Sequence, residues 1–348
     1  MMLDQELKDR LERLQFSDHQ RVILIDQLPV GYGGQLSGRL LGLKIGLALD
    51  RKAIFARDSD MPYIQSVVRP FSWTGDMHIA QAAPLAEISP SDPRALVRFN
   101  YIAFQKRLMQ IGMRPKERVV LEWVDRLLAD RFQFTRDDLQ KLDGWLVSWL
   151  HFIPELEKKL SLDIERIGVS GNILGVHIRR GDKKVETAYV PSEQIADAIG
   201  RIYAIWKFEG VFVATDNADA LSDLKLPPGI VLLFDREEIR YNNANHKMLF
   251  ANPEMSSQET YVAFKNFRLL CECGGIVGQN NAHFATLAAS VIFNRDSKAE
   301  RIDLIDPNRG PKITVFTQRL KLGVRSIVKS VLPRTILARL DRIIYRQK

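Results

Sequence analysis

Residues 173–182 read ILGVHIRRGD, and this stretch decides the fold. Its first six residues are largely apolar and predict a buried strand, and a charged loop follows directly. Downstream, strand patterns alternate with helical ones. The predicted strands are 173–178, 211–215, 230–234, 275–278 and 302–305, and the predicted helices are 192–206, 218–224, 258–271 and 282–293. Such alternation indicates an α/β fold with a doubly wound, Rossmann-like parallel sheet in the C-terminal half.

The N-terminal half begins with a unit of a similar kind. The pattern predicts a helix at 1–16, a strand at 22–26, a glycine loop at 31–34, a helix at 35–48 and a strand at 52–56. Strand, loop, helix and strand in this order open a βαβ unit with a right-handed crossover. From about 94 to 160 the apolar spacing predicts helices. Their core candidates are Trp123, Leu127, Leu128, Leu146, Trp149 and Leu150.

The change of pattern near residue 164 divides the chain. With 348 residues, the chain is long enough for two domains. We expect an N-terminal α/β domain at 1–160, a Rossmann-like domain at 161–312 and a basic amphipathic helical tail at 313–348, with the first boundary between about 155 and 170.

The cysteines and the N-terminus bear on location. Cys271 and Cys273 are separated by one residue, too close to link distant segments, and two thiols without a second pair disfavour a structural zinc site. The first 16 residues lack the apolar centre of a signal peptide, and no run of about 18 apolar residues occurs. We therefore expect a cytoplasmic protein in a reducing compartment.

The net charge of +8 belongs to the C-terminus. Residues 311–348 hold ten of the 50 Lys and Arg residues and one of the 42 Asp and Glu residues, so the rest of the chain is nearly neutral. A nucleic-acid-binding protein would spread its basic residues over a folded face, so we expect no nucleic-acid partner. The tail has helical apolar spacing on both sides of Pro333, with a basic stripe of Lys321, Arg325 and Lys329. This pattern suits either an anionic membrane surface or packing on the N-terminal domain.

Charged residues gather where the strand at 173–178 ends. His177, Arg179, Arg180, Lys183 and Glu186 all lie in or just after it, and strand alternation puts His177 and Arg179 on the same side. Two guanidinium groups at a strand end can bind a diphosphate, each contact being worth about 1.5–3 kcal/mol. No DxD-like carboxylate pair stands beside a phosphate loop, so arginine rather than Mg²⁺ would neutralise the phosphates. A surface cluster of salt bridges is the alternative.

Three other segments lie where ligands bind in doubly wound sheets, beyond the carboxyl ends of strands. Asp216 could anchor a loop or cap the following helix, and capping is the favoured role. Asn281 and His283 open a predicted helix whose N-terminal amides can receive a phosphate. Gly33 and Gly34 could bring backbone amides close to a phosphate, or could form only a tight turn.

Five motifs, taken in order, resemble the α-1,6-fucosyltransferases of glycosyltransferase family 23. They are GYGGQL (31–36), VVRPFSW (67–73), HIRRGDK (177–183), VATDN (213–217) and GQNNAHFATLAAS (278–290). The family includes the core-fucosylating enzymes of N-glycans and the rhizobial Nod-factor enzymes. The resemblance covers most of residues 20–295 and is strongest at HIRRGDK. Because the α-1,2-fucosyltransferases share an HxRRGD-like motif, the resemblance specifies the donor better than the linkage.

The resemblance implies a two-lobed, GT-B-like fold with an acceptor side at 1–160 and a GDP-sugar side at 161–312. It further implies GDP-fucose as donor and inverting transfer without a metal or other cofactor, in a bacterial-type enzyme. Arg179 and Arg180 would hold the diphosphate and stabilise the departing GDP, while Glu186 would remove the proton of the acceptor hydroxyl. His177 would face the guanosine, and Lys183 would lie beside the sugar or acceptor. Further donor-binding positions are Gly33, Gly34, Asp216, Asn266, Asn281 and His283.

The chain departs from the family at two donor positions. Asn281 and Ala282 replace a serine pair near the phosphate, and Asn266 falls at or near the aspartate that reads guanine. The expected function is fucosyl transfer to a glycan or a lipid-linked saccharide, as in polysaccharide biosynthesis, on the cytosolic membrane face. The alternatives are an α-1,2-type or other GDP-sugar transferase and a non-catalytic nucleotide-sugar binding protein.

Overall fold

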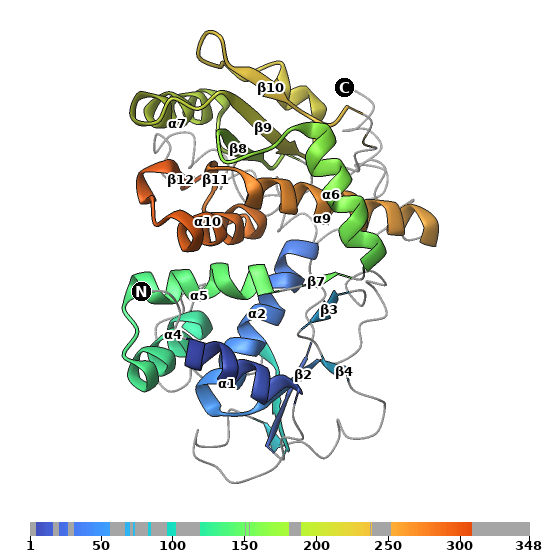
Figure 1. Ribbon diagram of the computed structural model, residues 1–348, viewed down its shortest axis with the longest axis vertical. Helices are drawn as coiled ribbons and strands as arrows, with labels where there is room; N and C mark the ends of the chain where they lie inside the picture. The colour runs from blue at the N-terminus through green and yellow to red at the C-terminus, as the bar shows by residue number, and fades with distance from the viewer. Residues whose placement is uncertain are drawn as a thin grey trace, which may run out of the picture.

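Two five-stranded parallel sheets organise the chain in the computed structural model, and helices lie between them (Figure 1). The structure describes residues 5–16, 21–26, 31–55, 67–69, 72–73, 83–84, 96–101, 119–149, 151–152, 154–180, 189–236, 238 and 252–307. The sheet built from the first hundred residues lies at one end of the long axis, and the sheet built from residues after 172 lies at the other.

The C-terminal sheet has the strand order β10-β9-β8-β11-β12, with all pairs parallel. Its strands are β8 (Ile173–Ile178), β9 (Gly210–Thr215), β10 (Val231–Leu233), β11 (Gly275–Gln279) and β12 (Ile302–Ile305). The chain runs outward from β8 to β10 and then restarts on the other side with β11. This order confirms the predicted α/β fold with a doubly wound sheet, whose switch point lies between β8 and β11.

Helices cover both faces of this sheet. Helix α7 (Ser192–Ile205) packs its apolar side on β8, where Leu174, Val176 and Ile178 belong to the same buried cluster as its own residues. Helix α9 (Pro253–Glu272) lies on the opposite face, since a Cβ at Gly175 would come within 3.1 Å of Leu270. Helix α10 (His283–Asp296) follows β11 on that same face.

The N-terminal sheet has the strand order β4-β2-β1-β6-β5, again with all pairs parallel. Its strands are β1 (Val22–Ile25), β2 (Lys52–Phe55), β4 (Ser72–Trp73), β5 (Ala83–Pro84) and β6 (Leu96–Phe99). Strands β2 and β4 lie on one side of β1, and β6 and β5 lie on the other. This sheet therefore has its own switch point, between β1 and β6.

Strand β6 corrects the prediction that residues from about 94 onward are helical. Val97 and Phe99 are buried and Arg98 lies between them, which is the alternation of a strand. This short segment is a strand because its backbone pairs with β1, where Leu24 lies opposite Arg98. Long-range pairing thus overrides the local helical spacing.

The remaining elements include predicted helices with shifted ends and three elements that were not predicted: an antiparallel strand pair, one strand of which lies in the region predicted to be helical, and the last 3₁₀ helix. They are α1 (Gln5–Phe16), α2 (Tyr32–Leu49), α4 (Val119–Phe132), α5 (Arg136–Trp149), α6 (Pro154–Ile167), the antiparallel pair β3 (Val67–Arg69) and β7 (His151–Phe152), and the 3₁₀ helices η5 (Ala218–Leu221) and η6 (Ala299–Arg301). The predicted glycine loop is in fact the first turn of α2. Helix α9 starts at 253, before the predicted 258, because Asn252 caps it and Pro253 fits the first position. The helix predicted at 218–224 is only η5.

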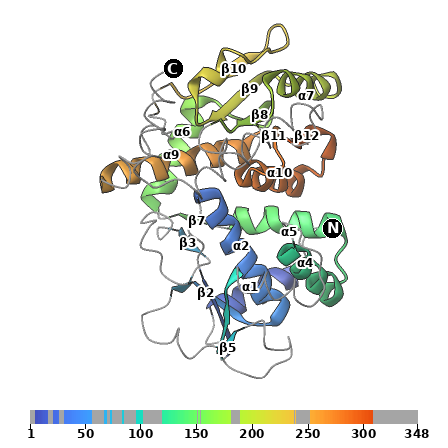
Figure 2. The same cartoon turned by 180° about the vertical axis from the view of Figure 1, so that it is seen from behind.

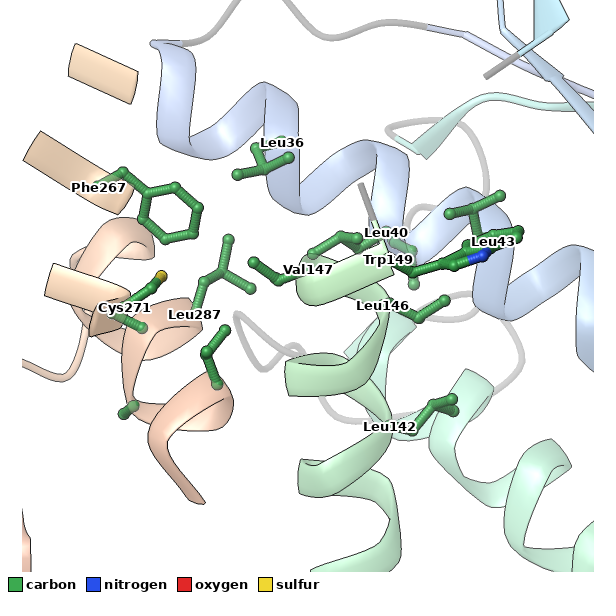
Figure 3. Packing of buried hydrophobic residues seen from close by; sticks show 14 of the residues in the cluster. Leu36, Leu40, Leu43, Leu142, Leu146, Val147, Trp149, Phe267, Cys271 and Leu287 are labelled. Atoms are coloured by element: carbon green, nitrogen blue, oxygen red, sulfur yellow. The ribbon is translucent and has the colours of Figure 1, made fainter. Parts of the chain in front are cut away.

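The two sheets share one continuous hydrophobic cluster, in which α2 and α5 meet α9 and α10. Figure 3 shows Leu36 and Val147 pointing toward Phe267 and Leu287. Helices α5 and α10 cross so closely that a Cβ at Gly144 would collide with the Ser290 carbonyl. Figure 2 shows the same two helices side by side from behind. The two-lobed division and the boundary between 155 and 170 stay predictions.

Most core candidates of the helical region are confirmed. Leu128, Leu146 and Trp149 are buried, and Trp123 and Leu127 are partly buried against the same cluster. Leu150 lies outside the described residues. The tryptophans therefore serve packing, as their helical spacing suggested.

Candidate functional site

The carboxyl end of β8 delivers the predicted arginines to the switch point of the C-terminal sheet. Arg179 follows the strand, and its Nη1 lies 2.9 Å from Oδ2 of Asp216. The backbone N–H of Arg180 donates to Oδ1 of the same carboxylate at 2.7 Å. One aspartate therefore fixes the guanidinium of the first arginine and the backbone of the second.

Asp216 corrects the prediction that it caps the next helix. The capping side chain is that of Asn217, whose Oδ1 accepts from the backbone N–H of Asp219 at 2.9 Å. Asp216 comes directly after β9, the neighbour of β8, so its side chain meets the loop that leaves β8. Loop anchoring, the less favoured of the two predicted roles, is the one that the geometry gives it.

The side chain of Arg180 lies toward the start of α7. Its Nη2 donates to the Ser192 hydroxyl at 2.9 Å, and its guanidinium carbon lies 5.5 Å from the ring centre of Tyr189. The Tyr189 hydroxyl in turn donates to the Arg180 carbonyl. Arg179 and Arg180 are thus both held in defined positions, but by different neighbours.

His177 lies on β8 beside Gly278 of β11. A Cβ added at Gly278 would lie 3.5 Å from the Cβ of His177. Burial, and then the nearby charge of Arg179, lowers the pKa of His177 to about 3. The ring is therefore neutral at physiological pH. Its Nδ1 is buried and makes no hydrogen bond with any residue that the structure describes. A buried polar atom in this state costs about 1–3 kcal/mol, and a bound ligand can satisfy it.

Helix α10 begins right after β11, so its N-terminus lies at the same switch point. Gln279 ends the strand and donates to the Asn281 side chain at 3.3 Å. No described side chain caps the helix at Ala282. The first N–H groups of α10 can therefore accept an anion such as a phosphate.

The first turn of α2 packs against that helix start. A Cβ at Gly33 would lie 3.0 Å from the Cβ of His283 and 3.2 Å from the ring of Phe284, so glycine permits the close approach. Ser37 Oγ lies 2.8 Å from Nδ1 of His283. Gly34 belongs to the same turn. The two predicted phosphate loops, remote in sequence, thus meet as two adjoining helix N-termini.

Asn266 belongs to a second cluster. Its Nδ2 donates to both carboxylate oxygens of Glu238, at 2.9 and 3.1 Å. Lys265 Nζ lies 2.7 Å from Glu238 and 2.6 Å from Asp235, and these three side chains are at most 5% exposed. Among the described residues, Asn266 therefore contacts this buried ion cluster rather than the arginines at the end of β8.

Several predictions fall outside the described residues. Lys183, Glu186 and the tail at 313–348 are among them, so their roles stay predictions. Within the described part of the chain, no helix is long and apolar enough to cross a membrane. The same residues contain no group of three or more His, Cys, Asp or Glu side chains that could hold a metal ion. Cys271 and Cys273 are buried free thiols.

Sequence reasoning missed four residues around the site: Ser37, Tyr189, Ser192 and Glu238. Ser37 meets a histidine 246 positions away, and no local pattern points to such a pair. Ser192 does carry a signal, because it follows Pro191 at the start of a predicted helix. That signal suggests a cap, whereas the hydroxyl accepts from Arg180.

No protein-family model matches the sequence, and no curated protein is significantly similar to it. The fold is similar to solved structures that include NodZ α-1,6-fucosyltransferase soaked with GDP-fucose, at 15% identity and a TM-score of 0.46, over 78% of this chain and 93% of that one. POFUT1 in complex with GDP-fucose matches at 9% identity and a TM-score of 0.44, over 84% of this chain and 99% of that one. A mutant of Arabidopsis thaliana FUT1 in complex with GDP matches at 11% identity and a TM-score of 0.48, over 83% of this chain and 73% of that one.

Proposed function

We propose that the chain is a glycosyltransferase that binds GDP-fucose beyond the carboxyl ends of β8, β9 and β11. The observation that carries this proposal is the pair of arginines at the switch point, beside the N-terminus of α10, where Asp216 fixes the Arg179 guanidinium and the Arg180 backbone. Preorganised positive groups and a helix N-terminus at one strand end suit a diphosphate. Resemblance at HIRRGDK supports GDP-fucose among the sugar nucleotides.

The phosphates and the nucleoside of GDP-fucose each have residues of matching chemistry at this site. Arg179 and Arg180 would provide charge-assisted N–H groups for the phosphates, and the first amides of α10, after Ala282, would add further N–H groups. Nδ1 of His177, which bonds to none of the described residues, is assigned to the nucleoside. Because the arginines are positioned before the donor arrives, little reorganisation opposes binding.

The proposed reaction is a single displacement with inversion. The acceptor hydroxyl oxygen attacks the anomeric carbon of fucose, while the bond from that carbon to the β-phosphate oxygen breaks. GDP leaves with the electron pair, which the two arginines stabilise without a metal ion. Glu186 takes the proton of the hydroxyl. The acceptor is a glycan or a lipid-linked saccharide, and the basic segment at 311–348 favours a lipid-linked one at an anionic surface.

The test is to incubate the full-length protein with GDP-fucose, GDP-mannose, UDP-glucose and ADP-glucose, and to measure the released nucleoside diphosphate. We expect release from GDP-fucose, with EDTA having no effect and GDP inhibiting. Equal turnover of the UDP or ADP sugars would contradict the donor assignment. Tight binding of GDP-fucose without hydrolysis or transfer would identify a non-catalytic binding protein instead.

Glu186→Gln serves as the decisive variant in this assay. It keeps the shape of the side chain and loses the proton acceptor, so transfer should fall by about 10²–10⁴-fold while GDP affinity stays within about twofold. The matched control is Glu193→Gln, since Glu193 is an exposed carboxylate in the first turn of α7. If Glu186→Gln kept full activity, the base would lie elsewhere, with Asp182 and Asp216 as the next candidates.

A further inference from the structure

Arg98 is a charged residue inside a strand of the N-terminal parallel sheet. It lies on β6 between the buried side chains of Val97 and Phe99, and opposite Leu24 of β1. Strands of parallel sheets are usually apolar throughout because helices cover both faces. A guanidinium at such a place therefore suggests a specific partner.

The aspartate that follows β1 holds this guanidinium by its inner nitrogen. Nε of Arg98 lies 3.0 Å from both carboxylate oxygens of Asp26, and Nδ2 of Asn100 donates to Oδ2 at 2.9 Å. The Asp26 side chain is 11% exposed and that of Arg98 is 38% exposed. The carboxylate is thus nearly buried and well bonded, whereas the guanidinium reaches solvent.

The outer edge of the guanidinium contacts no partner that the structure describes. Among the residues that the structure describes, Nη1 and Nη2 of Arg98 have no hydrogen-bond or ion-pair partner. A guanidinium that is fixed through Nε presents its two outer N–H groups in a defined direction. This edge matches the two oxygens of a carboxylate or a phosphate, and it offers no acceptor for a neutral hydroxyl group.

The position in the fold is that of a ligand site. Asp26 and Asn100 follow β1 and β6, the two strands at the switch point of the N-terminal sheet, where doubly wound sheets bind their ligands. The chain then leads from Asp26 to Gly33, which packs on the start of α10. Seven residues span at most about 25 Å, so Arg98 lies within the reach of a saccharide from the proposed donor site.

We propose that Arg98 binds an oxyanion, a carboxylate or a phosphate, on the acceptor saccharide, and that Asp26 is its positioning residue. The oxyanion site follows from the geometry of Arg98, whereas its assignment to the acceptor rests on the proposed function. The enzyme would thereby select an acidic acceptor over a neutral one of the same size. Neither the motifs nor the strand patterns pointed to this residue.

The first test uses the unmodified full-length protein without any nucleotide. Phenylglyoxal reacts with guanidinium groups, and peptide mass spectrometry reports the extent of reaction at Arg98. The probes are methyl glucuronide, glucose 1-phosphate, inorganic phosphate and, as the neutral control, methyl glucoside. We expect one or both acidic sugars to slow modification of Arg98 by tenfold or more at saturation, and methyl glucoside to leave it unchanged. The acidic sugar that protects better identifies the anion as a carboxylate or a phosphate.

Two outcomes of this test would overturn the proposal. Unchanged modification of Arg98 with every probe would exclude an oxyanion site. If inorganic phosphate protected Arg98 as well as the acidic sugars do, the site would bind free anions, and its assignment to the acceptor saccharide would be wrong. Turnover of GDP-fucose is measured separately, so protection without turnover would overturn the proposed function and keep the oxyanion site.

Variants then test the side chain itself. Arg98→Gln should abolish the preference for acidic over neutral sugars, and Arg98→Lys should keep the charge but lose most of the preference, because one ammonium cannot bind both oxygens in parallel. Arg201→Gln is the matched control, since Arg201 also pairs with a strand carboxylate, Asp303, at 2.8 Å. GDP affinity should stay unchanged in all three. If Arg98→Gln fails to fold, the protection result on the wild type decides.

Discussion

The switch points of the two parallel sheets both carry an arginine held by an aspartate, but they hold it in different ways. At the C-terminal sheet, Asp216 contacts an outer nitrogen of Arg179 and also the backbone of Arg180. At the N-terminal sheet, Asp26 contacts only the inner nitrogen of Arg98. The first arrangement fixes the side chain of Arg179 and the backbone of Arg180, whereas the second fixes one side chain, whose outer nitrogens bond to none of the described residues.

Under the proposed function, this difference gives the two sites different roles. Two arginines fixed at the end of β8 would hold a doubly charged leaving group, whose position must be constant during bond breaking. A single guanidinium with one available edge suits recognition of one carboxylate or phosphate. Substitutions at the C-terminal site should therefore affect nucleotide binding, and equivalent substitutions at the N-terminal site should not.

The largest contrast is expected for the arginines themselves. Arg179→Ala and Arg180→Ala should each weaken GDP binding by about 10–100-fold, because each removes a charge-assisted contact. Arg98→Ala should leave GDP affinity within about twofold. Isothermal titration of the full-length variants with GDP would measure this, and melting temperatures would confirm that each is folded. Wild-type affinity for GDP in Arg179→Ala or Arg180→Ala would contradict the assignment of these arginines to the diphosphate. A large loss of GDP affinity in Arg98→Ala would mean that Arg98 also belongs to the nucleotide site.

The next contrast uses the two aspartates. Asp216→Asn keeps an acceptor oxygen for the Arg180 N–H but loses the charge that holds Arg179, so GDP affinity should fall by about 3–10-fold. Asp26→Asn makes the same chemical change at the other sheet and should leave GDP affinity unaltered. Titration of the pair in parallel makes each variant the control of the other. Equal losses of GDP affinity would erase the proposed difference between the sites.

The sequence predicted the architecture of the C-terminal half well. Buried parallel strands such as 173–178 and 211–215 are short apolar runs, and such runs carry their own signal. The same reasoning failed at β6, because a four-residue strand with Arg98 in the middle does not differ locally from a helical stretch. Only pairing with β1 makes it a strand.

The site was predictable where one strand positions several residues. Alternation placed His177 and Arg179 on one side of β8, and the structure brings Arg179 to the switch point as expected. The roles of neighbouring Asp216 and Asn217 were not predictable, since either side chain can cap a helix. The choice depends on β8, which lies beside β9 and brings the Arg180 N–H to Asp216. Contacts across such distances, including Asp26 with Arg98, have no signature in a single sequence.

The last contrast concerns protein stability rather than nucleotide affinity, and it involves His177 and the charge of Arg179. Burial and Arg179 lower the pKa of His177 to about 3, whereas the unfolded chain titrates near its ordinary value of 6.5. Between about pH 6.5 and 3 the unfolded state therefore binds one more proton at this residue. The unfolding free energy should fall with falling pH by up to about 1.4 kcal/mol per pH unit from this group, and by less where solvent reaches the ring.

Urea unfolding between pH 7 and 5 would measure this dependence. His177→Gln should flatten the slope, because the variant has no proton to take up at this position. Arg179→Gln should raise the pKa of His177 by removing the repelling charge. The loss of stability should then still begin near pH 6.5 but should end at a higher pH and be smaller in total, which an unfolding series continued below pH 5 would show. The same slope in the wild type and His177→Gln would mean that the ring is not held neutral. Arg98→Gln is the control at the other sheet and should leave the contribution of His177 as it is, so the pH profile also tests whether the two arginine sites are separate.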